Sequence, residues 1–300
     1  MKNLHSDDHD LGLTHDLRLI SRRMAQQALQ RRRLLGLMLG AGAVSLLPGC
    51  DGDAAATVTD SSNGRTGIGT TTTTTTSSSG SCVADPTETN GPYPSDGSNS
   101  ANGSISNVLL QSGVVRSDIR SSFGTSGNAA PGVPLQLDIT IVDSNASCAP
   151  LGGYAVYLWH CTRDGLYSLY SSSVQNEDFL RGVQVSDANG KLSFSTIYPG
   201  CYDGRYPHVH FEVYQSLALA TGYANRVLVS QMAMPRTVSS SVYSGATGYS
   251  ASIANLAKVS IASDNVFGDN TDAQILAQTP SLTGSVDEGF NGTIVIGLAR

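Results

Sequence analysis

The sequence carries little charge. Only 14% of its 300 residues are Asp, Glu, Lys or Arg, and the formal net charge is −6. After Cys50 there are 11 basic residues against 20 acidic ones, and the basic residues form no cluster. A protein that grips the phosphate backbone needs a basic surface. We therefore expect no nucleic-acid partner.

Long hydrophobic runs are also missing. The apolar run Leu34–Leu47 has fourteen residues, whereas a membrane-spanning helix needs about 20. It follows Arg31, Arg32 and Arg33, and so is typical of the apolar region of a signal peptide. Paired arginines before two leucines resemble a twin-arginine export signal.

Small and apolar residues before Cys50 resemble a bacterial lipobox, although Pro48 is unusual there. We predict that residues 1–50 are an export signal and that the protein reaches the periplasm or cell envelope. Cys50 is the expected site of a lipid anchor to the membrane. The alternative is a plain cleaved signal without lipid.

Apolar periodicity is absent from residues 51–81. This stretch consists mainly of Ala, Thr, Ser and Gly, with seven threonines in a row at Thr70–Thr76. Such a composition cannot bury a core, which predicts a disordered linker. The globular domain is then expected at residues 82–300.

That domain has no long helical pattern, but it has clear strand patterns. Residues 134–143 alternate Leu135, Leu137, Ile139 and Ile141 on one face. Further strands are expected at 154–161, 208–214, 226–234 and 292–299. Residues 183–198 predict a hairpin that turns at 187–190, and 242–265 is expected to form loops and short turns. The fold class is all-β, a β-sandwich.

Cysteine is scarce, with five in the chain and four in the expected domain: Cys82, Cys148, Cys161 and Cys201. An even number in an exported protein permits two disulfides, with three possible pairings. A Cys161–Cys201 bridge would brace the segment between them. Free, buried thiols are the alternative.

Histidine is scarce, with three residues before Cys50 and three in the expected domain. His5, His9 and His15 precede Cys50, which leaves His160, His208 and His210. Residues i and i+2 of a strand share a face, so His208 and His210 can grip one ion. Alone this pattern also suits zinc or copper. His160 is expected to be a core histidine or a support behind the site rather than a ligand.

Two tyrosines accompany the histidine pair. Tyr202 follows the turn Pro199-Gly200, and Tyr167 follows an Asp-Gly turn at the end of a strand. A phenol has an ordinary pKa of about 10 and is a poor zinc ligand at neutral pH. Ferric iron, a small and highly charged Lewis acid, can hold phenolate. Two tyrosines with two histidines therefore favour a ferric site.

Four blocks of sequence resemble the intradiol ring-cleavage dioxygenases, the family of catechol and protocatechuate dioxygenases. They are ETNGPYP from Glu88, VYLWHCTRDGLYS from Val156, FLRGVQVSDANGKLSFSTIYPGCYDGR from Phe179 and HVHFEV from His208. The resemblance implies a β-sandwich of the intradiol dioxygenase type with non-haem Fe(III). It implies cleavage of a catechol-type ring by O2 between its two hydroxyl-bearing carbons, giving a muconate-type diacid. The chain would be an exported bacterial member.

The resemblance also implies roles for single residues. Tyr167, Tyr202, His208 and His210 would be the iron ligands, and Tyr202 would leave the iron when substrate binds. Arg205 would stabilise developing negative charge beside the iron. Gln231 matches a polar residue of the substrate pocket, and Tyr93 is a candidate to line that pocket.

Some features depart from the catabolic enzymes of the family. Only five residues separate Tyr202 from His208, where those enzymes have a longer loop, and no helical N-terminal domain is visible. These departures favour a larger, extracytoplasmic catechol. Two alternatives stay open, a non-catalytic exported binding module and a zinc or copper enzyme. The sequence leaves the oligomeric state open.

Overall fold

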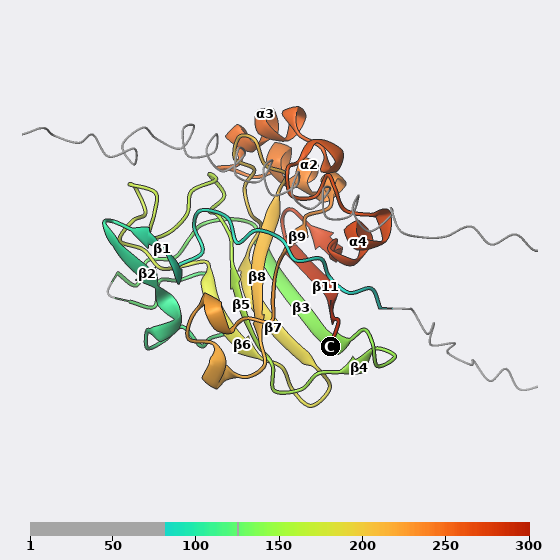
Figure 1. Ribbon diagram of the computed structural model, residues 1–300. Coiled ribbons are helices and arrows are strands. Elements are labelled where there is room, and N and C mark those ends of the chain that lie inside the picture. Colours follow the sequence, from blue (N-terminus) through green and yellow to red (C-terminus); the bar gives the residue numbers. More distant parts are fainter. Residues whose placement is uncertain (1–81, 125) are drawn as a thin grey trace, which may run out of the picture. The chain divides into compact units, whose positions relative to one another are not determined.

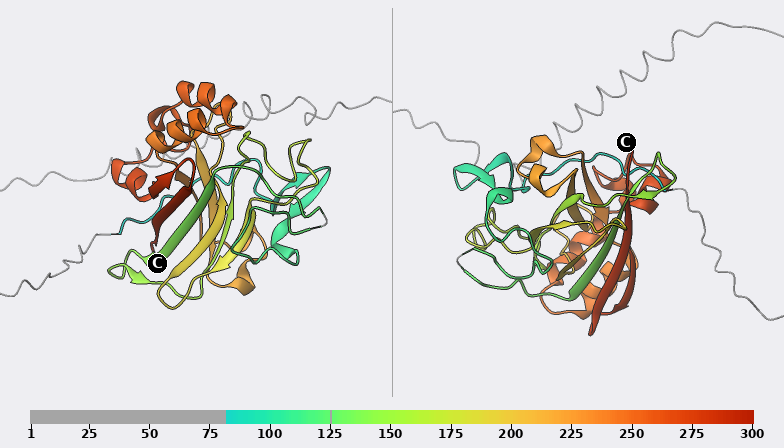
Figure 2. Two further views of the ribbon diagram at one scale, coloured as in Figure 1. Left: turned by 180° about the vertical axis from the view of Figure 1, so that it is seen from behind. Right: turned by 90° about the horizontal axis from the view of Figure 1, so that it is seen from below.

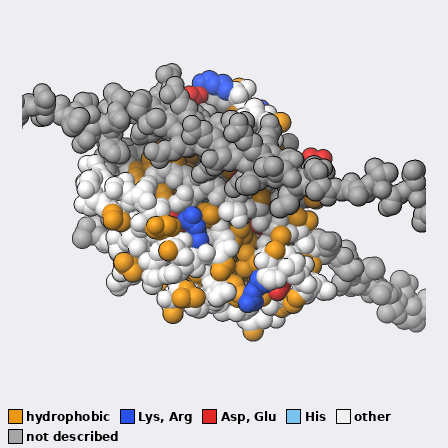
Figure 3. Space-filling model, in the orientation of Figure 1, with side chains coloured by type: hydrophobic (Ala, Val, Ile, Leu, Met, Phe, Trp, Pro, Cys, Tyr) orange, Lys and Arg blue, Asp and Glu red, His pale blue; other side chains and the backbone are white. Residues whose placement is uncertain are grey.

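The computed structural model describes residues 82–124 and 126–300. The predicted export signal, its Cys50 and the linker lie outside the described residues. No helix within the described part of the chain is long and apolar enough to cross a membrane. Charged side chains are sparse among the described residues on the face shown in Figure 3.

Most strands belong to two sheets (Figures 1 and 2). The larger sheet contains β10 (Ser281–Ser285), β11 (Gly289–Leu298), β3 (Pro134–Asp143) and β4 (Ala149–Pro150), with β7 (Lys191–Ile197) paired to β3. The smaller sheet has the order β6 (Arg181–Val185), β5 (Ala155–Trp159), β8 (His208–Tyr214) and β9 (Leu228–Ala233). A separate pair is formed by β1 (Asp96–Ala101) and β2 (Ser104–Asn107). Among the strand pairs that the structure describes, β11 and β3 are the ones that run parallel.

The main hydrophobic core fills the space between the two sheets. The alternating leucines and isoleucines of β3 join one core cluster with Val209, Phe211 and Val213 of β8. Each such side chain contributes about 1.5–3 kcal/mol when fully buried. The predicted sandwich is thereby confirmed. The opposite face of β8, which carries His208 and His210, is also buried.

The predicted hairpin over 183–198 is wrong. The turn forms, because the Asp187 carboxylate accepts hydrogen bonds from the backbone N–H groups of Asn189 and Lys191, both at 2.8 Å. Its two strands then part, since β6 pairs with β5 and β7 pairs with β3. The segment therefore carries the chain from one sheet to the other.

The expectation of loops over 242–265 is also wrong. Helices α2 (Arg236–Gly245) and α3 (Ser250–Lys258) occupy most of that region, and α4 (Asp272–Ala277) follows. Ser and Gly are weak helix formers, which hides α2 from a propensity argument. Val242 and Tyr243 are buried in the main core, so tertiary packing stabilises this helix. The described residues also include the short 3-10 helices η2 (Val108–Leu110), η3 (Leu217–Leu219), η4 (Tyr223–Asn225) and η5 (Ile261–Ser263).

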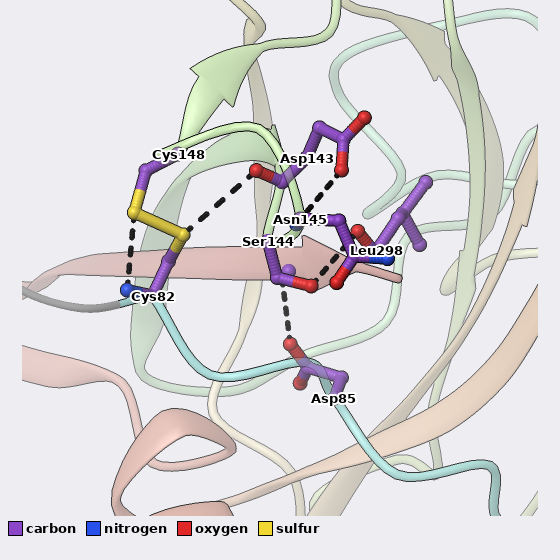
Figure 4. The surroundings of a disulfide bond; sticks show 8 residues. Cys82, Asp85, Asp143, Ser144, Asn145, Cys148 and Leu298 are labelled. Carbon is purple, nitrogen blue, oxygen red and sulfur yellow. Dashed lines mark hydrogen bonds between the residues drawn. A yellow bond between two sulfur atoms is a disulfide. The ribbon is translucent and has the colours of Figure 1, made fainter. Parts of the chain in front are cut away.

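One disulfide fixes the start of the described chain. Cys82 is bonded to Cys148, beside the end of β3 (Figure 4). Cys161 and Cys201 are free and buried. The considered Cys161–Cys201 bridge is therefore not formed. Their thiols donate instead to the backbone carbonyls of Gly200 and Arg205, both at 3.5 Å.

Candidate metal centre

The two histidines of β8 lie on the same face, as the strand period predicts, and their ring tips meet. The Nε2 atoms of His208 and His210 are 3.1 Å apart, and both side chains are buried. His208 Nδ1 lies 2.5 Å from the Tyr206 carbonyl oxygen. A carbonyl only accepts, so Nδ1 carries the proton and Nε2 offers its lone pair.

Both predicted tyrosines point at the same atoms. Tyr202, in the segment after β7, places its hydroxyl 3.1 Å from His208 Nε2. Tyr167, in the segment between β5 and β6, places its hydroxyl 3.4 Å from that atom. Two phenols and two imidazoles from three separate segments therefore converge on one point.

Burial sets the protonation of this cluster. Desolvation, followed by the positive charge of Arg205, lowers the pKa of His208 to about 3. Desolvation and the neighbouring His208 also lower the pKa of His210 well below its usual value. Desolvation raises the pKa of the Tyr167 and Tyr202 phenols above their usual range. The imidazoles are thus neutral, which is the form that binds metal.

The donor set fits a highly charged cation. Neutral imidazoles supply lone pairs without charge, and phenolates are stable in so buried a place only beside strong positive charge. His210 Nδ1 is buried and has no hydrogen-bond partner among the described residues. Within this part of the chain, no group of three or more His, Cys, Asp and Glu side chains could hold a metal. The side chains that accompany the histidine pair are two phenols, and this donor set does not favour zinc or copper.

Arg205 lies buried beside the cluster and is held by two partners. Its Nε and NH2 atoms contact the Asp264 carboxylate at 3.0 and 3.4 Å, and NH2 donates to Gln231 Oε1 at 2.6 Å. Gln231 Nε2 in turn donates to the Thr89 carbonyl at 2.9 Å. The Gln231 amide, expected in the substrate pocket, is thus engaged at both ends by protein groups. Asp264 was missed, because nothing local in the sequence pairs it with Arg205.

The segment that contains Tyr93 forms one wall of the site. The Tyr93 ring packs on the Tyr167 ring, with centroids 4.7 Å apart. Gly91 has a φ of +70°, and a Cβ there would lie 3.1 Å from His210 Cε1. Tyr93 therefore lies next to the site, and its role in lining a substrate pocket stays a prediction.

Two further residues lie near the histidine pair: Trp159, the last residue of β5, and His160, which follows that strand. His160 contacts Thr196 Oγ1 at 2.7 Å and the Cys161 carbonyl at 2.8 Å. Burial lowers the pKa of His160 to about 4. It is thus a satisfied core histidine, as the sequence favoured. Trp159, which sequence reasoning missed, stacks on His210 with ring centroids 4.8 Å apart.

Comparison with known sequences finds a match over the region that contains this site. A family model described as dioxygenase matches residues 116–227, which contain all four converging side chains. Chlorocatechol 1,2-dioxygenase from Rhodococcus opacus is 30% identical over 73 residues. That alignment covers 24% of this chain and 28% of the relative's length, well under two thirds.

Comparison with solved structures identifies the fold. The intradiol ring-cleavage dioxygenase from Tetranychus urticae superposes with a TM-score of 0.55 and 21% identity. The superposition covers 73% of this chain and 95% of that structure. The resemblance inferred from the sequence is confirmed by these matches, and the mostly β fold is one that intradiol dioxygenases share.

Proposed function

Because this chain is similar to the intradiol ring-cleavage dioxygenases in residues 116–227 and in fold, we propose that it catalyses their class of reaction. It cleaves a catechol-type ring between the two hydroxyl-bearing carbons with O2, giving a muconate-type diacid. The observation that carries this proposal is the convergence of two phenols and two neutral imidazoles around His208 Nε2.

A non-haem ferric ion would be held by Tyr167, Tyr202, His208 and His210. When bound, it supplies Lewis acidity that favours the phenolate and catecholate forms and draws electron density from the aromatic ring. The stacking of Trp159 on His210 and the bond from His208 Nδ1 to the Tyr206 carbonyl fix the two imidazole planes.

The remaining residues bind and orient the substrate and manage its charge. The Tyr202 oxygen is the group we assign to take a proton from the incoming catechol. Arg205 carries a positive charge next to both phenols, so it favours negative charge that develops on the ring. Tyr93 lines the wall beside Tyr167, and Gln231 keeps that wall attached to Arg205 through Thr89.

The substrate we propose is a bulky catechol met outside the cytoplasm. Only five residues join Tyr202 to His208, so this segment covers little of the site. The proposed export signal in residues 1–50, with a lipid anchor at Cys50, would place the enzyme in the periplasm or cell envelope. No nucleic acid takes part.

The proposal is tested on full-length protein matured in a host that exports it. We expect a burgundy colour from tyrosinate-to-iron charge transfer and about one iron per chain by elemental analysis. Catechol or caffeic acid, titrated without oxygen, should shift the band. Added O2 should be consumed one for one, giving a product 32 mass units above the substrate.

Each alternative predicts a different result. A binding module would be colourless and would consume no oxygen, and a zinc or copper enzyme would hold that metal instead. Tyr202→Phe should alter the visible band strongly, whereas the matched control Tyr223→Phe, at an exposed phenol, should not. Turnover of simple catechol with none of caffeic acid would refute the bulky substrate but not the ring cleavage.

A further inference from the structure

The Asp264 carboxylate accepts hydrogen bonds from two parts of the chain, residues 205–206 and residues 266–267. Oδ2 accepts from Arg205 Nε at 3.0 Å and from the Tyr206 backbone N–H at 2.7 Å. Oδ1 accepts from the backbone N–H groups of Val266 and Phe267, at 2.9 and 3.2 Å. Asp264 is itself fully buried, and its ion pair with Arg205 is shielded from water. The carboxylate is therefore a fixed support rather than a surface partner.

This support decides which edge of the Arg205 guanidinium stays available. Nε is taken by Asp264, and NH2 is shared between Asp264 and Gln231. NH1 makes no hydrogen bond to any described residue. Because a guanidinium is planar and rigid, fixing one edge fixes where the remaining nitrogen points.

We propose that Asp264 is a positioning residue that orients Arg205 toward the ring-bound oxygens of the substrate. This inference rests on the proposed function. A charged carboxylate is needed for two reasons. It compensates a buried cation, which is costly to leave unpaired. It also accepts on both oxygens, whereas an Asn in its place must turn its NH2 against another donor, whichever way it flips.

The first test is a double-mutant cycle on the iron-loaded enzyme. Asp264→Asn should lower kcat about 10- to 100-fold with iron content unchanged, as misplacement of a catalytic group does. In an Arg205→Ala background the same change should cost less than about 3-fold, because the residue acts through Arg205. Equal losses in both backgrounds would mean a merely structural role and overturn the proposal. The control Asp203→Asn, at an exposed carboxylate paired with Lys258, should change neither value.

The second test does not depend on enzyme activity, and the variant that it uses serves only to assign a signal. In ¹⁵N NMR of the wild-type protein loaded with diamagnetic Ga³⁺ in place of iron, the Arg205 Nε–H signal, assigned by its loss in Arg205→Lys, should exchange with water at least about 10-fold more slowly than that of exposed Arg120. Similar exchange rates would overturn the ion pair and with it the proposal. If the ion pair is present but no catechol is turned over, the proposed function fails. The anaerobic affinity for catechol is then measured for Asp264→Asn with and without Arg205→Ala. A loss of affinity that depends on Arg205 supports the role of Asp264, and equal losses overturn it.

Discussion

The buried polar face of β8 has two halves that differ in how their polar atoms are satisfied. In the second half, Glu212 contacts Arg226 at 2.6 Å and Tyr214 at 2.6 Å. Asp96 contacts the same arginine at 3.2 Å. In the first half, His208 and His210 face each other and two phenols, and His210 Nδ1 has no partner among the described residues.

The difference indicates that one half of β8 serves the fold and the other half serves the proposed metal centre. Buried polar groups cost free energy unless they are paired. The Glu212 half meets that requirement with groups of the protein itself. The histidine half brings two imidazole nitrogens and two phenols around one point, and a bound cation would complete that donor set. We therefore expect changes in the first half to affect the metal and changes in the second half to affect the fold.

The largest effect is expected from His210→Ala. Removal of one imidazole should lower iron affinity by at least about 100-fold and abolish the visible band, since even groups behind metal ligands change affinity 10- to 100-fold. Iron content by elemental analysis and folding by circular dichroism are the measurements. Tyr214→Phe, in the other half of the strand, is the control and should keep its iron. Full iron content in His210→Ala would refute the assignment of the site.

Arg226→Met should destabilise the fold through the second half of β8. It leaves the buried carboxyls of Asp96 and Glu212 without their cation, so unfolding free energy should fall by about 3–5 kcal/mol. Urea denaturation measures this loss, and iron content per folded chain should stay constant. Arg120→Met is the matched control. Its partner Asp118 is half exposed, and the loss there should be at most about 1 kcal/mol. Equal losses for the two arginines would contradict the comparison.

Asp85 is a buried carboxyl with no cation partner among the described residues, so the pH dependence of stability extends the comparison. Asp85 accepts from the Gly297 backbone N–H at 2.8 Å, and burial raises its pKa to about 7 (Figure 4). The folded state thus binds the proton more tightly than the unfolded state. The resulting stability is fully present below pH 4 and is lost as the pH rises through 7, by about 3 kcal/mol between pH 4.5 and 7.5.

Asp85→Asn removes this titration. Urea denaturation at the two pH values should therefore show a fall in stability that is smaller in the variant by about that amount. Asp118→Asn, at a half-exposed carboxyl whose pKa Arg120 lowers, is the control and should keep the wild-type fall. An unchanged fall in Asp85→Asn would show that the native carboxyl is ionised at neutral pH.

The features that local sequence patterns predicted correctly are those whose contacts are themselves local. The two-residue period set the bounds of Pro134–Asp143 and His208–Tyr214 residue for residue. It also placed both histidines on one face. The turn at Asp187 was found for the same reason, since its hydrogen bonds join residues two and four positions apart.

What was missed depends on contacts between distant residues. Whether β6 and β7 pair with each other is decided by β5 and β3, which lie elsewhere in the chain. Helix α2 forms because Val242 and Tyr243 reach the core, not because Ser and Gly favour helix. Asp264 lies 59 positions after Arg205, and no spacing rule connects an ion pair across that distance.

The smallest effect is expected at Gly91, where the wall touches the histidine half. Gly91→Ala and Gly103→Ala both place a Cβ at positive φ, +70° and +80°, so each should lose about 1 kcal/mol of stability. Only the first would put a Cβ against His210, 3.1 Å from Cε1, because nothing lies within 4 Å at Gly103. Gly91→Ala should therefore also weaken iron binding by roughly 10-fold.

Iron affinity measured by chelator competition separates the two variants, because backbone strain is common to both and the contact with the imidazole belongs to Gly91→Ala alone. If both variants bind iron as the wild type does, the segment at Gly91 does not affect the metal centre. The positions of His208 and His210 are then fixed by Trp159 and the two tyrosines.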